Sequence, residues 1–175
     1  MSKTKKDAVV RKERPTDIAD VRSLNIAAFP SEAEADLVDE LRVNGKATVS
    51  LVAVHDERII GHILFSPVMM ESNVGQDSIL GLAPMAVLPA FQRRGVGSLL
   101  VTTGLAQCKR NGVGAVVVLG NPDYYSRFDF QTASLSNIGC LYDVPDKYFM
   151  ALELADGVLS RISGTAQYQP EFSGV

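Results

Sequence analysis

The segment that most constrains the fold is a strand, a loop and a glycine-rich helix start in residues 82–98, LAPMAVLPAFQRRGVGS. Amides in the first turn of a helix have no acceptor within the helix, and the helix dipole is positive there. Gly95 and Gly97 remove side chains that would keep a ligand away from this backbone, and Arg93 and Arg94 add two positive charges. The segment therefore predicts a cradle for a pyrophosphate group, bound mainly by main-chain donors.

Two other phosphate-binding motifs fit this segment poorly. A P-loop requires Gly-Lys-Ser/Thr, which does not follow here. A dinucleotide-binding fingerprint requires a third glycine where Leu100 stands, and it follows the first strand of a chain rather than a hairpin. A nicotinamide-dependent enzyme is therefore a weak alternative. The purely structural alternative to a phosphate-binding cradle is a glycine-rich helix start with two solvated arginines.

Composition sets the broad class of the chain. Its 175 residues are a usual size for one domain, and 46% hydrophobic with 21% charged residues is ordinary for a globular protein. A net charge of −3 disfavours a nucleic-acid binder, and no apolar run is long enough for a membrane span or a secretory signal. Two cysteines and two histidines, without a CxxC pair, disfavour a disulfide framework or a metal centre and fit a reducing cytoplasm. We expect residues 1–8 to form a disordered tail and residues 9–175 a single domain.

Hydrophobic periodicity and turn residues predict a mixed α/β order. Strands are expected at 8–12, 48–55, 58–68, 78–88, 115–119 and 148–154, with 48–68 forming a hairpin and Pro84 breaking its strand. Helices are expected at about 16–28, from about 98 to 110, and at 121–128. A further helix is expected to begin at a capping box formed by Ser31 and Glu34. The unbroken apolar run at 115–119 predicts a central strand covered on both faces.

The stretch Gln92-Arg93-Arg94-Gly95-Val96-Gly97 resembles the Q/R-x-x-G-x-G/A signature of the GNAT N-acetyltransferases at every specified position. The resemblance is closest to the YhbS-like branch of that family. Similar stretches recur there as GHILFSPV (61–68), VLGNP (118–122), YYSRF (124–128) and SGT (163–165), so that the resemblance covers nearly the whole chain from Val9. It implies the GNAT fold, a mostly antiparallel mixed sheet of roughly six to seven strands with helices on both faces. In that fold the fourth and fifth strands splay apart and admit the pantetheine arm of the cosubstrate.

The resemblance further implies an N-acetyltransferase that uses acetyl-CoA as its acetyl donor and no metal. Backbone groups of Met85 to Val87 would bind the pantetheine arm and the thioester, and the amides of residues 93–98 would bind the pyrophosphate. The residues expected to bind the cosubstrate are Met85, Ala86, Val87, Gln92, Arg93, Arg94, Gly95, Val96, Gly97, Ser98, Asn121 and Tyr124.

Aligning YYSRFDF (124–130) with the family's tyrosine-containing stretch puts Tyr125 at the position of the general acid, with Tyr124 as its rival. A tyrosine suits this role because its pKa near ~10 keeps it protonated at neutral pH. Asp129 stands where the family usually has glycine, and aspartate tolerates the left-handed conformation better than most residues, so the turn is expected to survive with local strain. Packing of both tyrosines on a short helix is the structural alternative. Arg127 would contact a cofactor phosphate or cap that helix.

The sequence does not identify the base. His62 has suitable chemistry, but a lone histidine in an apolar strand is more often a hydrogen-bonded core residue. Glu32 and Glu34 lie at a link that often borders the acceptor pocket in this family, and a water chain could replace any of these side chains. Cys108 and Cys140 are weak candidates for an acetyl-cysteine route, because buried thiols are usually inert.

The expected partners are acetyl-CoA and a primary amine of a small molecule or a protein, which attacks the thioester directly in a ternary complex. No nucleic-acid or membrane partner is expected, and a homodimer is left open. A non-catalytic acyl-CoA sensor that has kept the cradle is the alternative function.

Overall fold

The computed structural model describes residues 7–175, so the first six residues of the expected tail lie outside the described part. The strands are β1 (Val9–Lys12), β2 (Val49–His55), β3 (Arg58–Pro67), β4 (Met69–Asn73), β5 (Ile79–Val87), β6 (Ala115–Leu119), β7 (Gln131–Thr132), β8 (Ile138–Cys140), β9 (Phe149–Glu153) and β10 (Ile162–Gln167). The α-helices are α1 (Ile18–Ala28), α2 (Ala33–Val43), α3 (Val96–Arg110) and α4 (Pro122–Tyr125). Short 3-10 helices cover Pro15–Asp17, Pro89–Phe91, Ser126–Phe128, Ala133–Ser136, Asp146–Tyr148, Val158–Ser160 and Pro170–Gly174.

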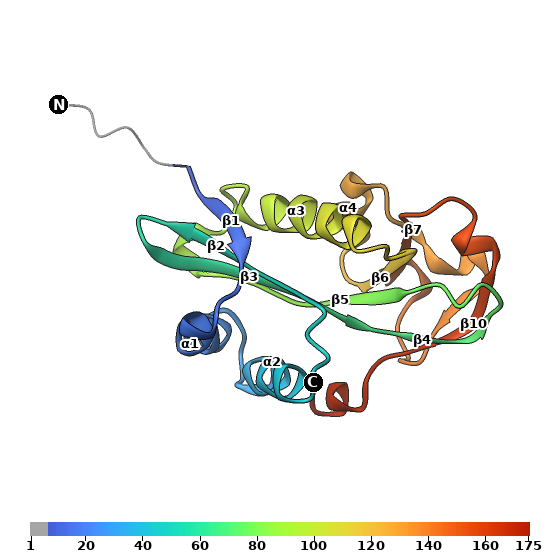
Figure 1. The fold of residues 1–175 in the computed structure, drawn as a ribbon, viewed down its shortest axis with the longest axis horizontal. Coiled ribbons are helices and arrows are strands. Elements are labelled where there is room, and N and C mark those ends of the chain that lie inside the picture. Colours follow the sequence, from blue (N-terminus) through green and yellow to red (C-terminus); the bar gives the residue numbers. More distant parts are fainter. Residues whose placement is uncertain (1–6) are drawn as a thin grey trace. The chain divides into compact units, whose positions relative to one another are not determined.

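The strands form two sheets (Figure 1). The larger has seven strands in the order β1-β2-β3-β5-β6-β9-β7, and the smaller has the order β4-β10-β8. In the larger sheet β5 and β6 are parallel, whereas β1 with β2, β6 with β9, and β7 with β9 are antiparallel. This mixed, mostly antiparallel sheet confirms the α/β class expected from the sequence.

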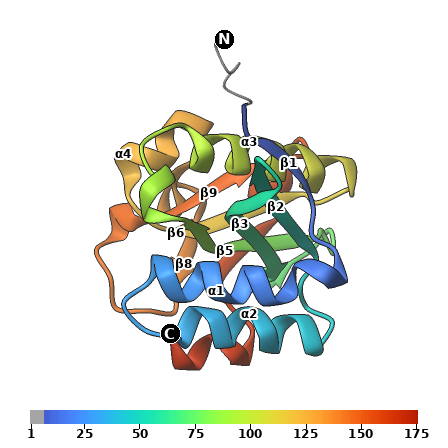
Figure 2. The ribbon, with the colours of Figure 1, turned by 90° about the vertical axis from the view of Figure 1, so that its left-hand side faces the viewer.

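The chain divides into two compact units, of which the first contains the described residues up to Leu64, Pro84–Gly104 and Gly174–Val175. Within it, α1 and α2 lie on one face of β2 and β3, and the first turns of α3 lie on the other (Figures 1 and 2). Gly61 allows this close packing, because a Cβ there would lie 2.9 Å from Leu100 Cδ1 and 3.1 Å from Val96 Cγ1. The interior positions of β3 are buried on both faces of the strand, as a strand between two helical layers requires.

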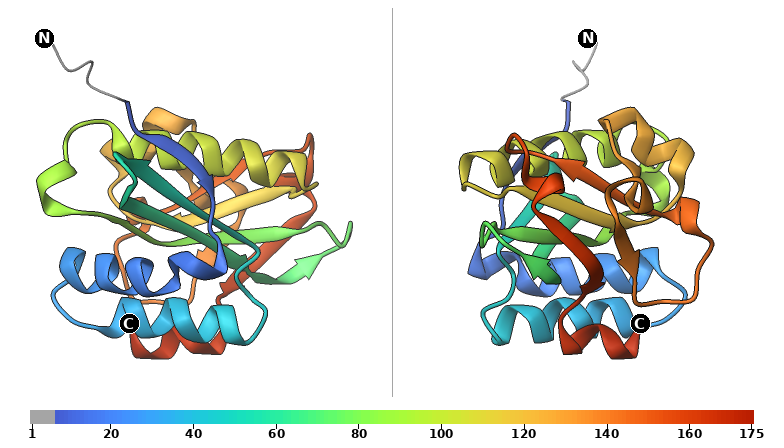
Figure 3. Two further views of the ribbon diagram at one scale, coloured as in Figure 1. Left: turned by 60° about the vertical axis from the view of Figure 1, so that its left-hand side comes forward. Right: turned by 90° about the vertical axis from the view of Figure 1, so that its right-hand side faces the viewer.

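The second unit contains Phe65–Ala83 and Leu105–Ser173. Its central strand β6 has four buried residues in a row and pairs with β5 on one side and β9 on the other, which confirms the central strand expected at 115–119. The smaller sheet joins distant segments, since β10 pairs with β4 (Figure 3). Glu71 of β4 also accepts a hydrogen bond from the Thr165 amide of β10. The sequence reasoning missed β4, β7, β8 and β10.

The expected capping box of Ser31 and Glu34 is wrong. Helix α2 begins at Ala33 with Glu32 as its N-cap, so the third helical position is Ala35 rather than Glu34. Ser31 Oγ instead accepts from the Ala33 amide at 3.3 Å, which is a local turn contact. A shift of one residue in the helix start is enough to abolish the reciprocal pairing that the box requires.

The expected break at Pro84 is also wrong, because β5 runs without interruption through Val87. The Leu88 amide donates to Ile60 O, and the Val68 amide donates to Ile79 O, both at 2.9 Å. Between these bonds the chain advances eight residues on the β3 side (60 to 68) and nine on the β5 side (79 to 88). The extra residue marks a β-bulge in β5, and a bulge is a place where a strand accommodates a proline without losing a ladder hydrogen bond.

Candidate active site

The loop that enters α3 has two left-handed residues and leaves backbone amides without a backbone acceptor in the described part of the chain. Arg93 and Gly95 both adopt left-handed backbone conformations, with φ of 59° and 82°. The first α3 amide bonded within the chain is that of Leu99, which donates to Gly95 O at 3.0 Å. The amides of residues 96–98 have no backbone acceptor within residues 7–175. Left-handed residues next to a helix start turn successive amides toward one concave side, where an anion can accept from them.

The side chains of this loop leave its backbone accessible. Gln92, Arg93, Arg94 and Gly95 are exposed, and a Cβ built on Gly95 would meet no atom within 4 Å. Gln92 Nε2 donates to Val87 O at 3.0 Å and so fixes the loop to the end of β5. The guanidinium of Arg94 lies 5.7 Å from the centroid of the Phe91 ring. The charges of the two arginines therefore stand at the helix start without a carboxylate partner among the described residues.

Strand β5 continues beyond its pairing with β6. That pairing covers Ile79–Gly81 of β5 and Ala115–Val117 of β6, whereas β5 extends to Val87. Of the residues expected to bind the pantetheine arm, Ala86 is buried and Met85 and Val87 are half-buried. One acceptor of this stretch, Val87 O, is already used by Gln92.

The second candidate segment, residues 121–130, lies in the second unit. Asn121 Oδ1 accepts from the Asp123 amide at 2.9 Å and caps α4, so its side chain has a structural role. Arg127 Nε donates to Tyr124 O at 3.2 Å, and its guanidinium lies 4.4 Å from the Tyr124 ring centroid. Of the two roles expected for Arg127, this geometry is the helix-capping one. Asp129 has φ of 68°, so the family's glycine-type turn is kept here by an aspartate.

The two tyrosines differ in their surroundings. Tyr125 is buried with 8% of its surface exposed, and its ring packs so closely on Gly120 that a Cβ there would lie within van der Waals overlap of it. Burial, with a smaller contribution from Tyr124, raises the pKa of Tyr125 above its ordinary value. A raised pKa keeps the phenol protonated at neutral pH, which is the state that a general acid needs. The Tyr124 hydroxyl is buried without a hydrogen-bond partner within the described residues.

The candidate bases fall into different environments. Glu32 is an exposed carboxylate that pairs with Arg22 at 3.1 Å, whereas Glu34 has one buried oxygen without a partner in residues 7–175. His62 is fully buried. Both cysteines are free thiols; burial raises the pKa of Cys108 to about 12 and also raises the pKa of Cys140. Neither thiol is therefore a nucleophile near neutral pH, which argues against the acetyl-cysteine route.

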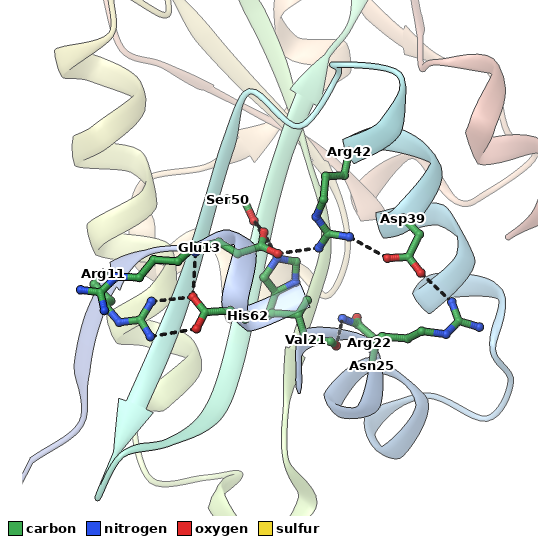
Figure 4. Close-up of polar contacts among 11 residues, drawn as sticks. Arg11, Glu13, Val21, Arg22, Asn25, Asp39, Arg42, Ser50 and His62 are labelled. Atoms are coloured by element: carbon green, nitrogen blue, oxygen red, sulfur yellow. Dashed lines mark hydrogen bonds and ion pairs between the residues drawn. The ribbon is translucent and has the colours of Figure 1, made fainter. Parts of the chain in front are cut away.

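Sequence reasoning missed the partners of His62. Its Nε2 lies 2.9 Å from Ser50 Oγ, and Ser50 in turn donates to Glu13 (Figure 4). Glu13 stands 37 residues from Ser50 and 49 from His62, so only tertiary folding brings the three together. No local sequence pattern signals such a group.

Within residues 7–175 no cluster of three His, Cys, Asp or Glu side chains is arranged to hold a metal ion. Nor does this part of the chain contain a helix with the length and apolar character needed to cross a membrane.

Comparison with known proteins decides the family. The model of the Acetyltransferase (GNAT) family matches residues 18–130. The chain belongs to the GNAT family of N-acetyltransferases. It is 36% identical to the Uncharacterized N-acetyltransferase YhbS of Escherichia coli (strain K12), over 94% of this chain and 98% of that protein.

Two solved structures show the same GNAT fold at high similarity. The Escherichia coli YhbS structure in complex with CoA is 36% identical, has a TM-score of 0.87, and covers 94% of this chain and 91% of its own. A GNAT family acetyltransferase from Brucella melitensis in complex with acetyl-CoA is 34% identical, with a TM-score of 0.79, and covers 95% of this chain and 99% of its own. These similarities confirm the resemblance that the signature at residues 92–97 indicates.

Proposed function

We propose that this GNAT protein transfers the acetyl group of acetyl-CoA to a primary amine of a small molecule or a protein, by direct attack in a ternary complex. The observation that carries the proposal is the set of unpaired amides at the start of α3, in a chain whose relatives from Escherichia coli and Brucella melitensis contain CoA or acetyl-CoA. Unpaired polar donors at a helix start match the oxygen-rich pyrophosphate of this cosubstrate.

The residues present fit the cosubstrate. The amides of residues 93–98 would bind the pyrophosphate, with Arg93 and Arg94 adding charge and the open space over Gly95 admitting the phosphate oxygens. The backbone of Met85 to Val87, beyond the part of β5 that pairs with β6, would bind the pantetheine arm. Asn121 and Tyr124 complete the proposed binding set. Gln92 acts through Val87 O as a positioning residue.

The chemistry needs a proton donor and a neutral amine. The thioester of acetyl-CoA supplies the acyl carbon that the amine attacks. Tyr125, kept in its protonated form by burial, would give its proton to the departing thiolate. Main-chain amides facing the carbonyl oxygen would stabilise the charge that develops there.

The test is release of free CoA from acetyl-CoA by the purified protein with a panel of primary amines. We expect amine-dependent release, and we expect Tyr125→Phe to lower kcat about 100-fold, in line with the loss of a general acid, while calorimetry shows unchanged CoA affinity. Tyr148→Phe, which removes an exposed phenol hydroxyl outside the proposed site, is the matched control and should retain most of the activity. If the wild-type protein released no amine-dependent CoA with any amine, acetyl transfer would be refuted, whereas equal amine-dependent release by the wild type and Tyr125→Phe would refute only the role of Tyr125 as the acid. Tight CoA binding without turnover would then favour the non-catalytic sensor.

The free thiols of Cys108 and Cys140 support a reducing compartment, and we place the protein in the cytoplasm. Fractionation followed by immunodetection tests this assignment. Light scattering of the purified protein decides between a monomer and the homodimer that the sequence leaves open.

A further inference from the structure

The imidazole of His62 lies on the side of β3 that α1 and α2 cover. Its neighbour Gly61 faces Leu100 and Val96 of α3, and side chains alternate along a strand, so His62 points to the face covered by α1 and α2. Figure 4 shows the ring in that layer, with Arg42 of α2 and Asn25 of α1 near it. None of its surface is exposed. Strand β3 is also the hydrogen-bonded neighbour of β5, and the bond from the Leu88 amide to Ile60 O puts His62 beside residues 85–87.

A buried carboxylate supports one nitrogen of this ring. Glu13, whose side chain is 8% exposed, receives a hydrogen bond from Ser50 and an ion pair from Arg42 at 2.5 Å. Burial alone would raise the pKa of Glu13, but interactions with His62, Ser50 and Arg42 outweigh it and lower the pKa to about 2. Glu13 is therefore an anion at neutral pH. Its Oε2 lies 3.7 Å from His62 Nε2, too far for a direct hydrogen bond, so that Ser50 is the link between them.

The ionised carboxylate fixes the direction of the hydrogen bonds. A serine hydroxyl has one hydrogen, and an ionised carboxylate can only accept, so Ser50 gives its hydrogen to Glu13. Ser50 Oγ can then only accept from His62, which requires a hydrogen on Nε2. In the neutral ring Nδ1 consequently carries a lone pair. That atom is buried and has no hydrogen-bond partner among residues 7–175.

We propose that His62 is the general base of the proposed acetyl transfer, with Nδ1 accepting a proton from the ammonium form of the acceptor, and with Ser50 and Glu13 as positioning residues. The proposal rests on the proposed function and deepens it. A carboxylate that orients a histidine through the nitrogen opposite the reacting one is a recurrent arrangement for a histidine that accepts a proton.

The protons and bonds of the step balance. The ammonium group gives one proton to Nδ1, and the resulting amine forms a C–N bond with the acyl carbon. The C–S bond then breaks: Tyr125 gives its phenol proton to the departing sulfur and regains a proton from the nitrogen, which loses its second proton in this step. The proton on His62 returns to solvent after the products leave. The imidazolium formed in the first step faces one anion, Glu13, with Arg42 of α2 behind it and the neutral Asn25 on α1.

The decisive measurement is the pH profile of kcat/KM for CoA release, with the amine that reacts fastest with the wild-type protein. The wild-type profile should reach a plateau near neutral pH. His62→Gln should be about 100-fold slower at pH 7.5 and should keep rising into the alkaline range, because only amine that has already lost its proton reacts. A merely structural role would lower the rate without changing this shape.

Matched variants separate the alternatives. His55→Gln removes the other histidine and should keep the wild-type profile. Ser50→Ala should lower kcat and shift the plateau, and Ser50→Thr, which keeps the hydroxyl, should restore both. If His62→Gln kept the wild-type plateau, or if Glu34→Gln alone removed it, His62 would not be the base although acetyl transfer would stand. No turnover by the wild-type protein with any amine would overturn both proposals.

A spectroscopic readout is independent of the acceptor. Nitrogen-15 NMR of labelled histidine in the His55→Gln protein should show the Nε2–H tautomer of His62 at neutral pH. Glu13→Gln should abolish this preference, because a neutral amide can donate to Ser50 and reverse the hydrogen-bond direction. An Nδ1–H tautomer in the otherwise wild-type network would contradict the proposal.

Discussion

At the scale of single residues, Asp129 shows how a departure from a family pattern can be accommodated. The turn after Ser126–Phe128 requires a left-handed residue, and Asp129 meets it with φ of 68° while its amide donates to Ser126 O. Aspartate pays a smaller steric penalty there than other residues with a Cβ, since its short polar side chain can bond locally. The sequence predicts this outcome because the demand on the backbone is local.

The strain at this position predicts the effect of substitution. Asp129→Gly should leave the free energy of unfolding within about 0.5 kcal/mol of the wild-type value, because relief of strain offsets the added freedom of the unfolded chain. Asp129→Val should lower it by about 1–2 kcal/mol, since a β-branched residue fits the left-handed region poorly. Urea unfolding measures both. Asp143→Val, at an exposed position without positive φ, is the control and should change little.

At the scale of elements, an ion-pair network ties the end of β1 to the two helices that follow. Arg42 of α2 bonds both Glu13 and Asp39, and Asp39 also bonds Arg22 of α1 (Figure 4). The most buried carboxylate of this network is Glu13. Its role could not be predicted from the sequence, because its partners are 29 and 37 residues away and no periodic pattern connects them.

This network predicts a loss of stability in acid. The pKa of Glu13 is about 2 in the folded protein and about 4.5 when unfolded, so the stabilisation is complete above pH 5 and disappears as the pH falls from 4.5 to 2. After allowance for solvent screening it amounts to about 2 kcal/mol. Urea unfolding at pH 6, 4.5 and 3 should show this slope in the wild-type protein and a weaker one in Glu13→Gln. Glu40→Gln, at an exposed position on α2, should keep the wild-type slope; an unchanged slope in Glu13→Gln would refute the assignment.

The elements also show where sequence patterns suffice. Strands β2, β3, β5, β6 and β9 are apolar runs bounded by turns, and each lies within about two residues of its expected range. Strand β4 has the sequence MMESN, mostly exposed and partly polar, and its partner β10 contains Gly164 in a left-handed conformation. These two strands become strands through pairing of residues that are 89 to 98 positions apart, which no local propensity signals.

At the scale of the whole molecule, ligand binding and unfolding are linked. A ligand that binds only the folded state stabilises it by RT ln(1 + [L]/Kd), about 2.7 kcal/mol at a hundredfold excess over Kd. For a chain of this size each kcal/mol raises Tm by about 2–4 °C, so saturating CoA should raise Tm by about 5–10 °C. NADH should not raise Tm, because the loop lacks the third glycine of a dinucleotide site.

The number of unfolding transitions tests the domain organisation. A single calorimetric transition would support the expectation of one domain over residues 9–175, and two transitions would contradict it.

The same measurement locates the cradle. Gly97→Glu puts bulk and a negative charge among the α3 amides, so it should abolish the Tm increase produced by CoA while leaving Tm without ligand nearly unchanged. Gly139→Glu is the matched control, because a Cβ at that position meets no atom within 4 Å and the added charge is the same. It should keep the full increase. Because electrostatic attraction to a pyrophosphate weakens with ionic strength, the wild-type increase should also shrink in concentrated salt. If Gly97→Glu kept the full increase with CoA, the amides at the start of α3 would not be the pyrophosphate site.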